Sequence, residues 1–192
     1  MSGDALAVFA YGSLVSRASA AATLGREPAP FEPAVLTGWR RGFVQARHNP
    51  SCEKTFARAD GGGVPEWILG LGIEPDPGGR VNGALLGLTE AEADRLDARE
   101  LRYERRDVTD AIDGPAWGRV FTYVAREAHR APEPPPGAVI LASYAAATEA
   151  AFSELGPAEL ERYRESTLVP DVEIVEGVLI RDEIPPGNPR EW

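Results

Sequence analysis

The sequence predicts an α+β protein in which helices flank a mixed β-sheet that curls towards a barrel. Three observations lead to this fold class. Strand-like segments fill the middle of the chain, helical segments lie on both sides of them, and no internal repeat is present. The length of 192 residues fits a single domain over residues 1–192, and an apolar fraction of 43% is sufficient for a core.

The extended segments are recognised by apolar runs that end at glycine, proline or other turn residues. Strands are expected at residues 5–11, 34–46, 67–73, 81–88, 103–112, 118–126 and 172–180. Gly38 is expected to make a bend or bulge in one of them. Residues 48–65, with three consecutive glycines, are predicted to form a loop, and residues 74–80, with two prolines and two glycines, are predicted to form a turn.

The helical segments are recognised by apolar spacing and by their end signals. Helices are expected at residues 14–24, 89–101, 138–155 and 157–166. The second of these begins with a capping box, in which Thr89 bonds forward and Glu92 bonds back. A proline-rich tail follows from about residue 181.

Charge and composition limit the partners and the compartment. The formal net charge of −10 argues against nucleic acid and against an anionic membrane surface, because both attract basic patches. Cys52 is the single cysteine, so an intramolecular disulfide is impossible, which fits a reducing compartment. We see neither a signal peptide nor an apolar run long enough to span a membrane, and therefore expect a cytoplasmic protein.

Motifs for most kinds of catalytic chemistry are missing from the sequence. The two histidines, His48 and His129, lie in predicted loops, and nothing marks a nucleophile beside either of them. No His or Cys pair has zinc-like spacing, and no glycine-rich motif fits a phosphate. The sequence therefore predicts neither a metal nor a cofactor.

Glu100 stands out among the carboxylates by its position. Ala93, Leu96 and Glu100 are spaced i, i+3, i+7 and share one face of the predicted helix. Glu100 thus extends an apolar stripe that points inward, in the last turn, where the helix dipole disfavours a negative charge. Such a carboxylate is a candidate general acid or base. The alternative is that the helix end frays, so that Glu100 pairs on the surface with Arg99, Arg102 or Arg105.

Arg40 and Arg41, in the segment GWRRGF, alternate faces if this segment is a strand. One of them could bind a ligand carboxylate. The other interpretation is that one is solvated and the other stacks on Trp39.

Three stretches, taken in order, resemble the gamma-glutamylcyclotransferase family. The first is the N-terminal strand that ends in YGSL, at residues 11–14. The second is VNGALLGLTEAEADRLDARELRYERRDV, a strand-helix-strand unit that carries LDxRE. The third is the late helix with Tyr144, followed by Gly156-Pro157 and ELERY, so that the resemblance covers about residues 7–164.

The resemblance implies a gamma-glutamylcyclotransferase-like fold and a set of site residues. Backbone NH groups of the YGSL-type loop would bind a gamma-glutamyl group, and Glu100 would be the acid/base. The loop residues are Tyr11, Gly12, Ser13 and Leu14, and the further substrate-binding candidates are Tyr144 and Tyr103. LDxRE and GWRRGF lean towards the glutathione-degrading ChaC-type branch. Val15-Ser16 and Leu101-Arg102-Tyr103 depart from the pattern of that branch, so the substrate stays open.

The implied reaction is an internal aminolysis of a small gamma-glutamyl peptide or amine. The substrate's own α-amino group attacks its γ-carbonyl, and the products are 5-oxoproline and an amine. The nucleophile belongs to the substrate, which fits the missing catalytic serine, cysteine and metal motifs. The competing interpretation is a non-catalytic module of the same fold that binds a small carboxylate and docks a partner through EIPPGNPREW. The oligomeric state stays open.

Overall fold

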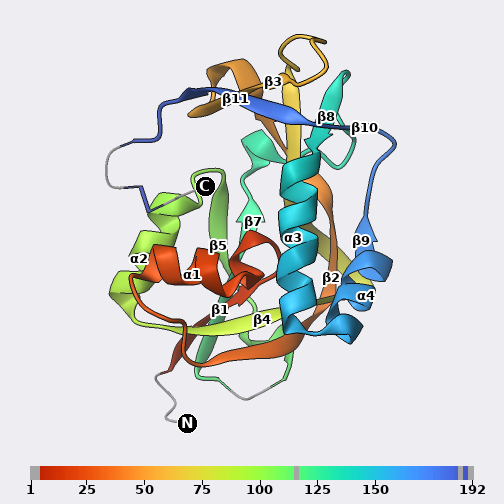
Figure 1. Ribbon diagram of the computed structural model, residues 1–192. Coiled ribbons are helices and arrows are strands. Elements are labelled where there is room, and N and C mark those ends of the chain that lie inside the picture. Colours follow the sequence, from red (N-terminus) through yellow and green to blue (C-terminus); the bar gives the residue numbers. More distant parts are fainter. Residues whose placement is uncertain (1–4, 115–116, 186–187, 190–192) are drawn as a thin grey trace.

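The computed structural model describes residues 5–114, 117–185 and 188–189 (Figure 1). Its longer strands are β1 (Leu6–Ala10), β2 (Phe31–His48), β3 (Lys54–Arg58), β4 (Trp67–Leu88), β5 (Tyr103–Asp107), β7 (Arg119–Ala125), β8 (Ala138–Leu141) and β11 (Gly177–Asp182). The short strands are β6 (Ile112–Asp113), β9 (Thr167–Leu168) and β10 (Glu173–Val175). The α-helices are α1 (Arg17–Leu24), α2 (Glu90–Arg99), α3 (Ala142–Leu155) and α4 (Pro157–Ser166). This mixture of strands and helices confirms the predicted α+β class.

A nine-stranded mixed sheet forms the centre of the described structure. Its main path runs β10-β8-β4-β1-β7-β5, and β2 pairs along almost the whole length of β4. β1 lies antiparallel to β4 and parallel to β7. The predicted curl does not reach a closed barrel, because β5 and β10 stand at opposite ends of this path and each pairs with one neighbour only among the described residues.

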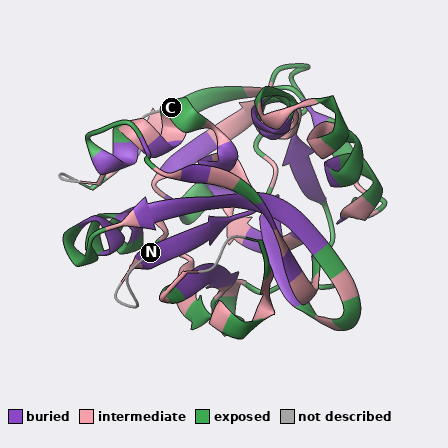
Figure 2. Cartoon of the chain, turned by 90° about the horizontal axis from the view of Figure 1, so that it is seen from below, coloured by how far each residue is buried: buried purple, intermediate pink, exposed green. Residues whose placement is uncertain are grey.

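The four described α-helices form two pairs. α1 and α2 lie together on one side of the molecule, and α3 and α4 lie on the other (Figure 1). Figure 2 shows buried residues along the central strands and exposed residues on the outer surfaces of the helices. None of the described helices is long and apolar enough to cross a membrane.

The predicted capping box of α2 is confirmed, whereas α1 begins later in the sequence than predicted. Thr89 accepts a hydrogen bond from the Glu92 amide, and the Glu92 carboxylate accepts one from the Thr89 amide, so both halves of the capping box are formed. The predicted helix at residues 14–24 is divided. A 3₁₀ turn covers Ser13–Val15, and α1 then begins after Ser16, whose side chain caps it.

Three segments form strands where a loop, a turn or part of a helix was predicted. The loop at 48–65 contains strand β3, which pairs with the C-terminal strand β11. The turn at 74–80 lies within strand β4, where residues 76–79 bulge opposite Gly38 while the pairing continues on both sides. The first four residues of the predicted helix at 138–155 form strand β8, because they pair in parallel with β4 and β10.

Candidate functional site

Two adjoining cavities lie between the sheet and the helices. The inner cavity has a volume of about 50 Å³ and the outer one about 390 Å³. The inner cavity is lined by Phe9, Ala10, Tyr11, Gly12, Ser13, Leu14, Leu71, Glu100, Tyr103, Tyr123 and Tyr144. Ser13, Glu100, Tyr103 and Tyr144 line both cavities, so the two spaces meet beside Glu100. The seven site residues predicted from the sequence therefore all face the inner cavity.

Glu100 ends helix α2 and faces the cavities. It is the C-cap residue, and its amide bonds to the Leu96 carbonyl. Its side chain is 12% exposed and forms an ion pair with Arg99, at 3.1 Å between Oε1 and Nε. The sequence left open whether Glu100 points inward or pairs with an arginine on the surface. The structure combines the two, because the pair with Arg99 is itself buried.

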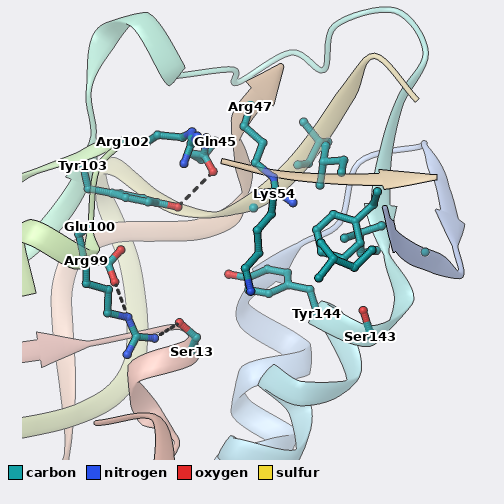
Figure 3. Close-up of a pocket in the computed structure, with 17 residues that line it drawn as sticks. Ser13, Gln45, Arg47, Lys54, Arg99, Glu100, Arg102, Tyr103, Ser143 and Tyr144 are labelled. Atoms are coloured by element: carbon teal, nitrogen blue, oxygen red, sulfur yellow. Dashed lines mark hydrogen bonds and ion pairs between the residues drawn. The ribbon is translucent and has the colours of Figure 1, made fainter. Parts of the chain in front are cut away.

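Arg99 is the main feature of the site that the sequence reasoning missed. Its guanidinium donates to the Ser13 hydroxyl at 3.2 Å (Figure 3). It also donates to the Ser19 hydroxyl at 2.8 Å. One side chain thus joins the YGSL loop, helix α1 and Glu100. The signal was present in the sequence, since residue 99 continues the 93, 96 spacing of the buried face of α2.

The YGSL loop forms the turn between β1 and α1. Gly12 precedes the 3₁₀ turn, and its carbonyl accepts from the Val15 amide at 2.9 Å. The first NH groups of such a turn have no carbonyl partner within it, so they are suited to an anionic ligand. A Cβ on Gly12 would lie 3.9 Å from the Tyr144 hydroxyl, so the missing side chain keeps space in the inner cavity.

Tyr103 and Tyr144 are held by the same residue of β4. In β2 the pairing shifts between Gly42 and Gln45, so that a bulge lies opposite Leu71. The Tyr103 hydroxyl donates to the Leu71 carbonyl at 2.7 Å, and the Tyr144 hydroxyl accepts from the Leu71 amide at 3.3 Å. The bulge thus frees the carbonyl and NH groups of Leu71 to bind Tyr103 and Tyr144, respectively. These two hydrogen bonds fix both rings at the junction of the cavities.

Tyr11 is a buried wall of the inner cavity. Its hydroxyl donates to the Tyr123 carbonyl at 2.7 Å. Burial, and then the nearby Glu100 carboxylate, raise the pKa of Tyr11 well above its ordinary value, so it stays a neutral phenol at pH 7.

Arg40 and Arg41 both lie outside the linings of the two cavities. Arg40 is half exposed and pairs with Glu74. Arg41 is fully buried and lies against the rings of Phe152 and Tyr163, at 4.8 and 4.4 Å from their centroids. The interpretation that one arginine stacks on Trp39 is therefore wrong, and Arg41 instead donates to the Tyr11 carbonyl behind the YGSL loop.

The described residues do not bring three His, Cys, Asp or Glu side chains close enough together to hold a metal ion. The chemical groups around the inner cavity are the Glu100 carboxylate with the Arg99 guanidinium beside it, the Ser13 hydroxyl, phenol hydroxyls and backbone NH groups. Such a set can orient a small polar molecule and move protons, with Glu100 as the ionisable carboxylate.

The fold and the site define a class, namely α+β proteins in which a loop after the first strand faces a glutamate across a two-part pocket. The family model described as "Gamma-glutamyl cyclotransferase, AIG2-like" matches residues 8–141. This match spans more than half of the chain, so the chain belongs to that family. No curated protein matches the sequence.

Two solved structures, a gamma-glutamyl cyclotransferase and YkqA, agree with the fold. A structure named gamma-glutamyl cyclotransferase is 16% identical, with a TM-score of 0.57 over 88% of this chain and 90% of its own. YkqA from Bacillus subtilis is 21% identical, with a TM-score of 0.55 over 84% of this chain and 54% of its own. A protein from Arabidopsis thaliana is 27% identical, with a TM-score of 0.40 over 64% of this chain and 62% of its own. The chain thus spans less than two thirds of the length of the Bacillus subtilis protein and of the Arabidopsis thaliana protein.

Proposed function

We propose that this protein is a gamma-glutamyl cyclotransferase that acts without a cofactor, releasing 5-oxoproline and an amine from a small gamma-glutamyl compound. The observation that carries the proposal is the position of Glu100. It lies where the inner cavity, next to the YGSL loop, meets the larger outer cavity. The gamma-glutamyl group would occupy the inner cavity, and the leaving amine would lie in the outer one.

The proposed reaction begins with a proton transfer. The substrate's α-ammonium gives a proton to Glu100, and the resulting amine attacks the γ-carbonyl carbon. A carbon–nitrogen bond forms and closes a five-membered lactam. The bond to the leaving nitrogen then breaks as Glu100 returns that proton to the leaving nitrogen, and the lactam nitrogen, which still carries two hydrogens, gives its extra proton to the freed Glu100 carboxylate. Glu100 passes this second proton to the released amine, which leaves as an ammonium ion. One carboxylate is sufficient because the two proton transfers follow one another and each returns Glu100 to its ionised form.

Positioning is the other contribution of the protein. Holding the γ-glutamyl chain in the folded attack geometry is worth up to about 7–11 kcal/mol for a well-oriented intramolecular reaction. NH groups of Ser13 and Leu14 are suited to the α-carboxylate or to the developing oxyanion. Tyr103 and Tyr144, fixed by Leu71, would wall the reacting centre.

Glu100→Gln is expected to reduce turnover by at least about 100-fold, because the amide keeps the shape of the side chain but cannot shuttle a proton. The measurement is 5-oxoproline release from glutathione, gamma-glutamyl amino acids and gamma-glutamyl amines. Glu104→Gln, at an exposed residue of β5, is the matched control and should keep the wild-type rate. The wild type releasing no 5-oxoproline from any of these compounds would contradict the proposal, and near wild-type rates for Glu100→Gln would remove Glu100 from the mechanism.

A further inference from the structure

Glu100 lies where helix α2 ends and a short turn to strand β5 begins. Its amide donates to the Leu96 carbonyl at 2.8 Å, and its carbonyl accepts from the Tyr103 amide at 3.0 Å. Helix ends fray unless other contacts hold them, because their last carbonyls lack partners within the helix. The position of the Glu100 carboxylate therefore depends on the contacts that hold residues 100–103, the Glu100 turn.

Arg102 anchors the Glu100 turn through an ion pair. Its guanidinium donates to the two carboxylate oxygens of Glu53, at 2.9 and 2.5 Å. The two side chains are 13% and 9% exposed, so the pair is shielded from water. Leu101, by contrast, is 40% exposed and adds little apolar anchoring to the turn. The pair with Glu53 thus holds the turn where its own apolar side chain does not.

Glu53 is in turn held by the C-terminal part of the chain. It directly precedes strand β3, and its carbonyl accepts from the Glu183 amide at 2.6 Å. The neighbouring Cys52 carbonyl accepts from the Arg181 guanidinium at 3.1 Å. Strands β3 and β11, the β3–β11 ribbon, pair with each other in a two-stranded sheet that is separate from the main sheet. Arg102 therefore connects the Glu100 turn to this ribbon.

Two arginines flank Glu100 and bind different walls of the site. Arg99 donates to Ser13 of the YGSL loop, and Arg102 donates to Glu53 at the start of the β3–β11 ribbon. Figure 3 shows Arg99 beside Ser13 on one side of Glu100 and Arg102 on the other. An arginine that donates to both oxygens of a carboxylate fixes orientation as well as distance. The pair with Glu53 thus restrains the turn from the side that Arg99 does not reach.

The proposed reaction places a strict geometric demand on Glu100. Its carboxylate takes protons from nitrogen atoms of the substrate and gives them to the leaving nitrogen, so it has to stay within hydrogen-bond reach of these atoms. A displacement of about 1 Å can reduce the rate by as much as about 100-fold. Because other groups bind the substrate, a displaced Glu100 lowers kcat more than it changes KM.

We propose that Arg102 and Glu53 are positioning residues for Glu100, and that their ion pair ties the Glu100 turn to the β3–β11 ribbon. This inference rests on the proposed cyclotransferase function. The family resemblance does not supply it, because Leu101-Arg102-Tyr103 depart from the pattern of the ChaC-type branch. The arginine that anchors the turn is therefore a feature of this chain.

The test measures 5-oxoproline release from whichever of glutathione, gamma-glutamyl amino acids and gamma-glutamyl amines the wild type converts fastest. Glu53→Gln and Arg102→Gln should each lower kcat by about 10–100-fold, the effect of a displaced acid/base, with little change in KM. Arg102→Lys, which keeps the charge but loses the paired geometry, should have an intermediate kcat. Urea denaturation verifies that each variant is folded under the assay conditions.

The double variant Glu53→Gln/Arg102→Gln distinguishes one shared contact from two separate effects. If both residues act through their ion pair, the double variant loses no more activity than the worse single variant, because the second substitution removes a contact that is already broken. Losses that multiply would overturn the proposal. A loss in Arg102→Gln without one in Glu53→Gln would assign the effect to the charge of Arg102 and would also overturn it.

Hydrogen exchange follows the Glu100 turn without relying on activity. In Glu53→Gln the Tyr103 amide, which bonds to the Glu100 carbonyl, should exchange faster than in the wild type. Glu92→Gln breaks an ion pair with Arg26 at the other end of α2 and is the matched control. It should leave both kcat and the exchange of the Tyr103 amide unchanged.

The outcomes separate this inference from the proposed function. Wild-type kcat in both single variants, or a rise in KM without a loss of kcat, would overturn the positioning role and leave the cyclotransferase intact. Unchanged exchange of the Tyr103 amide in Glu53→Gln would overturn the anchoring of the turn. Release of 5-oxoproline from none of the compounds by the wild type would overturn the proposed function, and with it a catalytic purpose for the pair.

Discussion

At the scale of single residues, Arg99 shows how closely the candidate site is joined to the core. Its guanidinium contacts Ser13 of the YGSL loop, Glu100 and, through the Ser19 carbonyl and Thr23 hydroxyl, helix α1. The loop and the glutamate are far apart in the sequence, so a shared partner fixes their relative position. The site therefore depends on one buried cation that touches both of its halves.

Gly12 gives a prediction at the same scale. In Gly12→Ala the added methyl group would project towards Leu71 and the Tyr144 hydroxyl, at 3.7 and 3.9 Å, and occupy part of the inner cavity. We expect kcat/KM to fall by about 10–200-fold, the usual effect of one methylene-sized change in a tight pocket. Its φ is −138°, so the free energy of unfolding should change by less than about 1 kcal/mol.

The control for this substitution is Gly78→Ala. Gly78 lies in β4, and a Cβ there would meet no atom within 4 Å among the described residues. It should leave both the rate and the stability close to wild type. A wild-type rate in Gly12→Ala would show that the substrate does not use the space beside Gly12.

At the scale of elements, the bulge in β2 decides where the two tyrosines lie. It removes Leu71 of β4 from regular pairing, and Tyr103 and Tyr144 occupy the vacated backbone groups. Tyr103 comes from β5 and Tyr144 from α3. A local irregularity of one strand pair thus connects two elements that are remote in sequence.

Helix α2 provides a pH-dependent prediction. The hydrogen-bonded Arg26, and then the amide and hydroxyl of Thr89, lower the pKa of Glu92 from 4.5 to about 2. A lowered pKa in the folded state stabilises the protein above about pH 4.5, and this stabilisation is lost as the pH falls towards 2. Because Arg26 is 38% exposed, solvent screens the pair, and we expect Glu92→Gln to cost about 1–2 kcal/mol at pH 7.

Urea denaturation at pH 7, 5 and 3 checks this expectation. The difference between wild type and Glu92→Gln should be nearly the same at pH 7 and pH 5 and should be smaller at pH 3, which lies between the two pKa values. Glu90→Gln, in the same helical turn but with an exposed partner, should cost less than about 0.5 kcal/mol. An undiminished Glu92→Gln difference at pH 3 would mean that the Arg26 pair is not the source of the stabilisation.

At the scale of the whole molecule, Arg41 joins the sheet to the C-terminal helices and to the site. Its guanidinium donates to the Tyr11 and Asn82 carbonyls, the Asn82 side chain and the hydroxyls of Ser166 and Thr167. Burial lowers the pKa of Arg41 to about 10, so it remains charged at pH 7. A buried cation is tolerated here because oxygen atoms surround it.

Arg41→Met is expected to reduce the free energy of unfolding by at least about 3 kcal/mol, since it leaves buried carbonyls without donors. Arg40→Met is the matched control at the neighbouring residue. It should cost less than about 1 kcal/mol, because Arg40 is half exposed and Glu74 also pairs with Arg130. Equal losses for the two variants in chemical denaturation would contradict the bracing role of Arg41.

Local patterns in the sequence were sufficient for the fold class and for the positions of most of the helices. The Thr89 capping box, the break at Gly156-Pro157 and the 93, 96, 100 spacing depend on neighbours within one helix or turn, so they can be read directly. The YGSL loop and Glu100 were found by resemblance, and the structure brings them to the same cavity. Their catalytic roles remain predictions.

Contacts between distant segments of the chain decided the remaining strands and the outer cavity. Residues 138–141 became a strand because β4 and β10 lie on either side of them, and strand β3 formed because β11 returns to pair with it. Lys54 and Gln45 carry no local signal of a site, and they share a cavity only once these strands are in place. The sequence by itself determined the α+β class, and its resemblance to the family selected seven of the residues that line the inner cavity. Only the tertiary structure decided the outer cavity, because pairing between remote strands depends on the energy of the whole packed sheet.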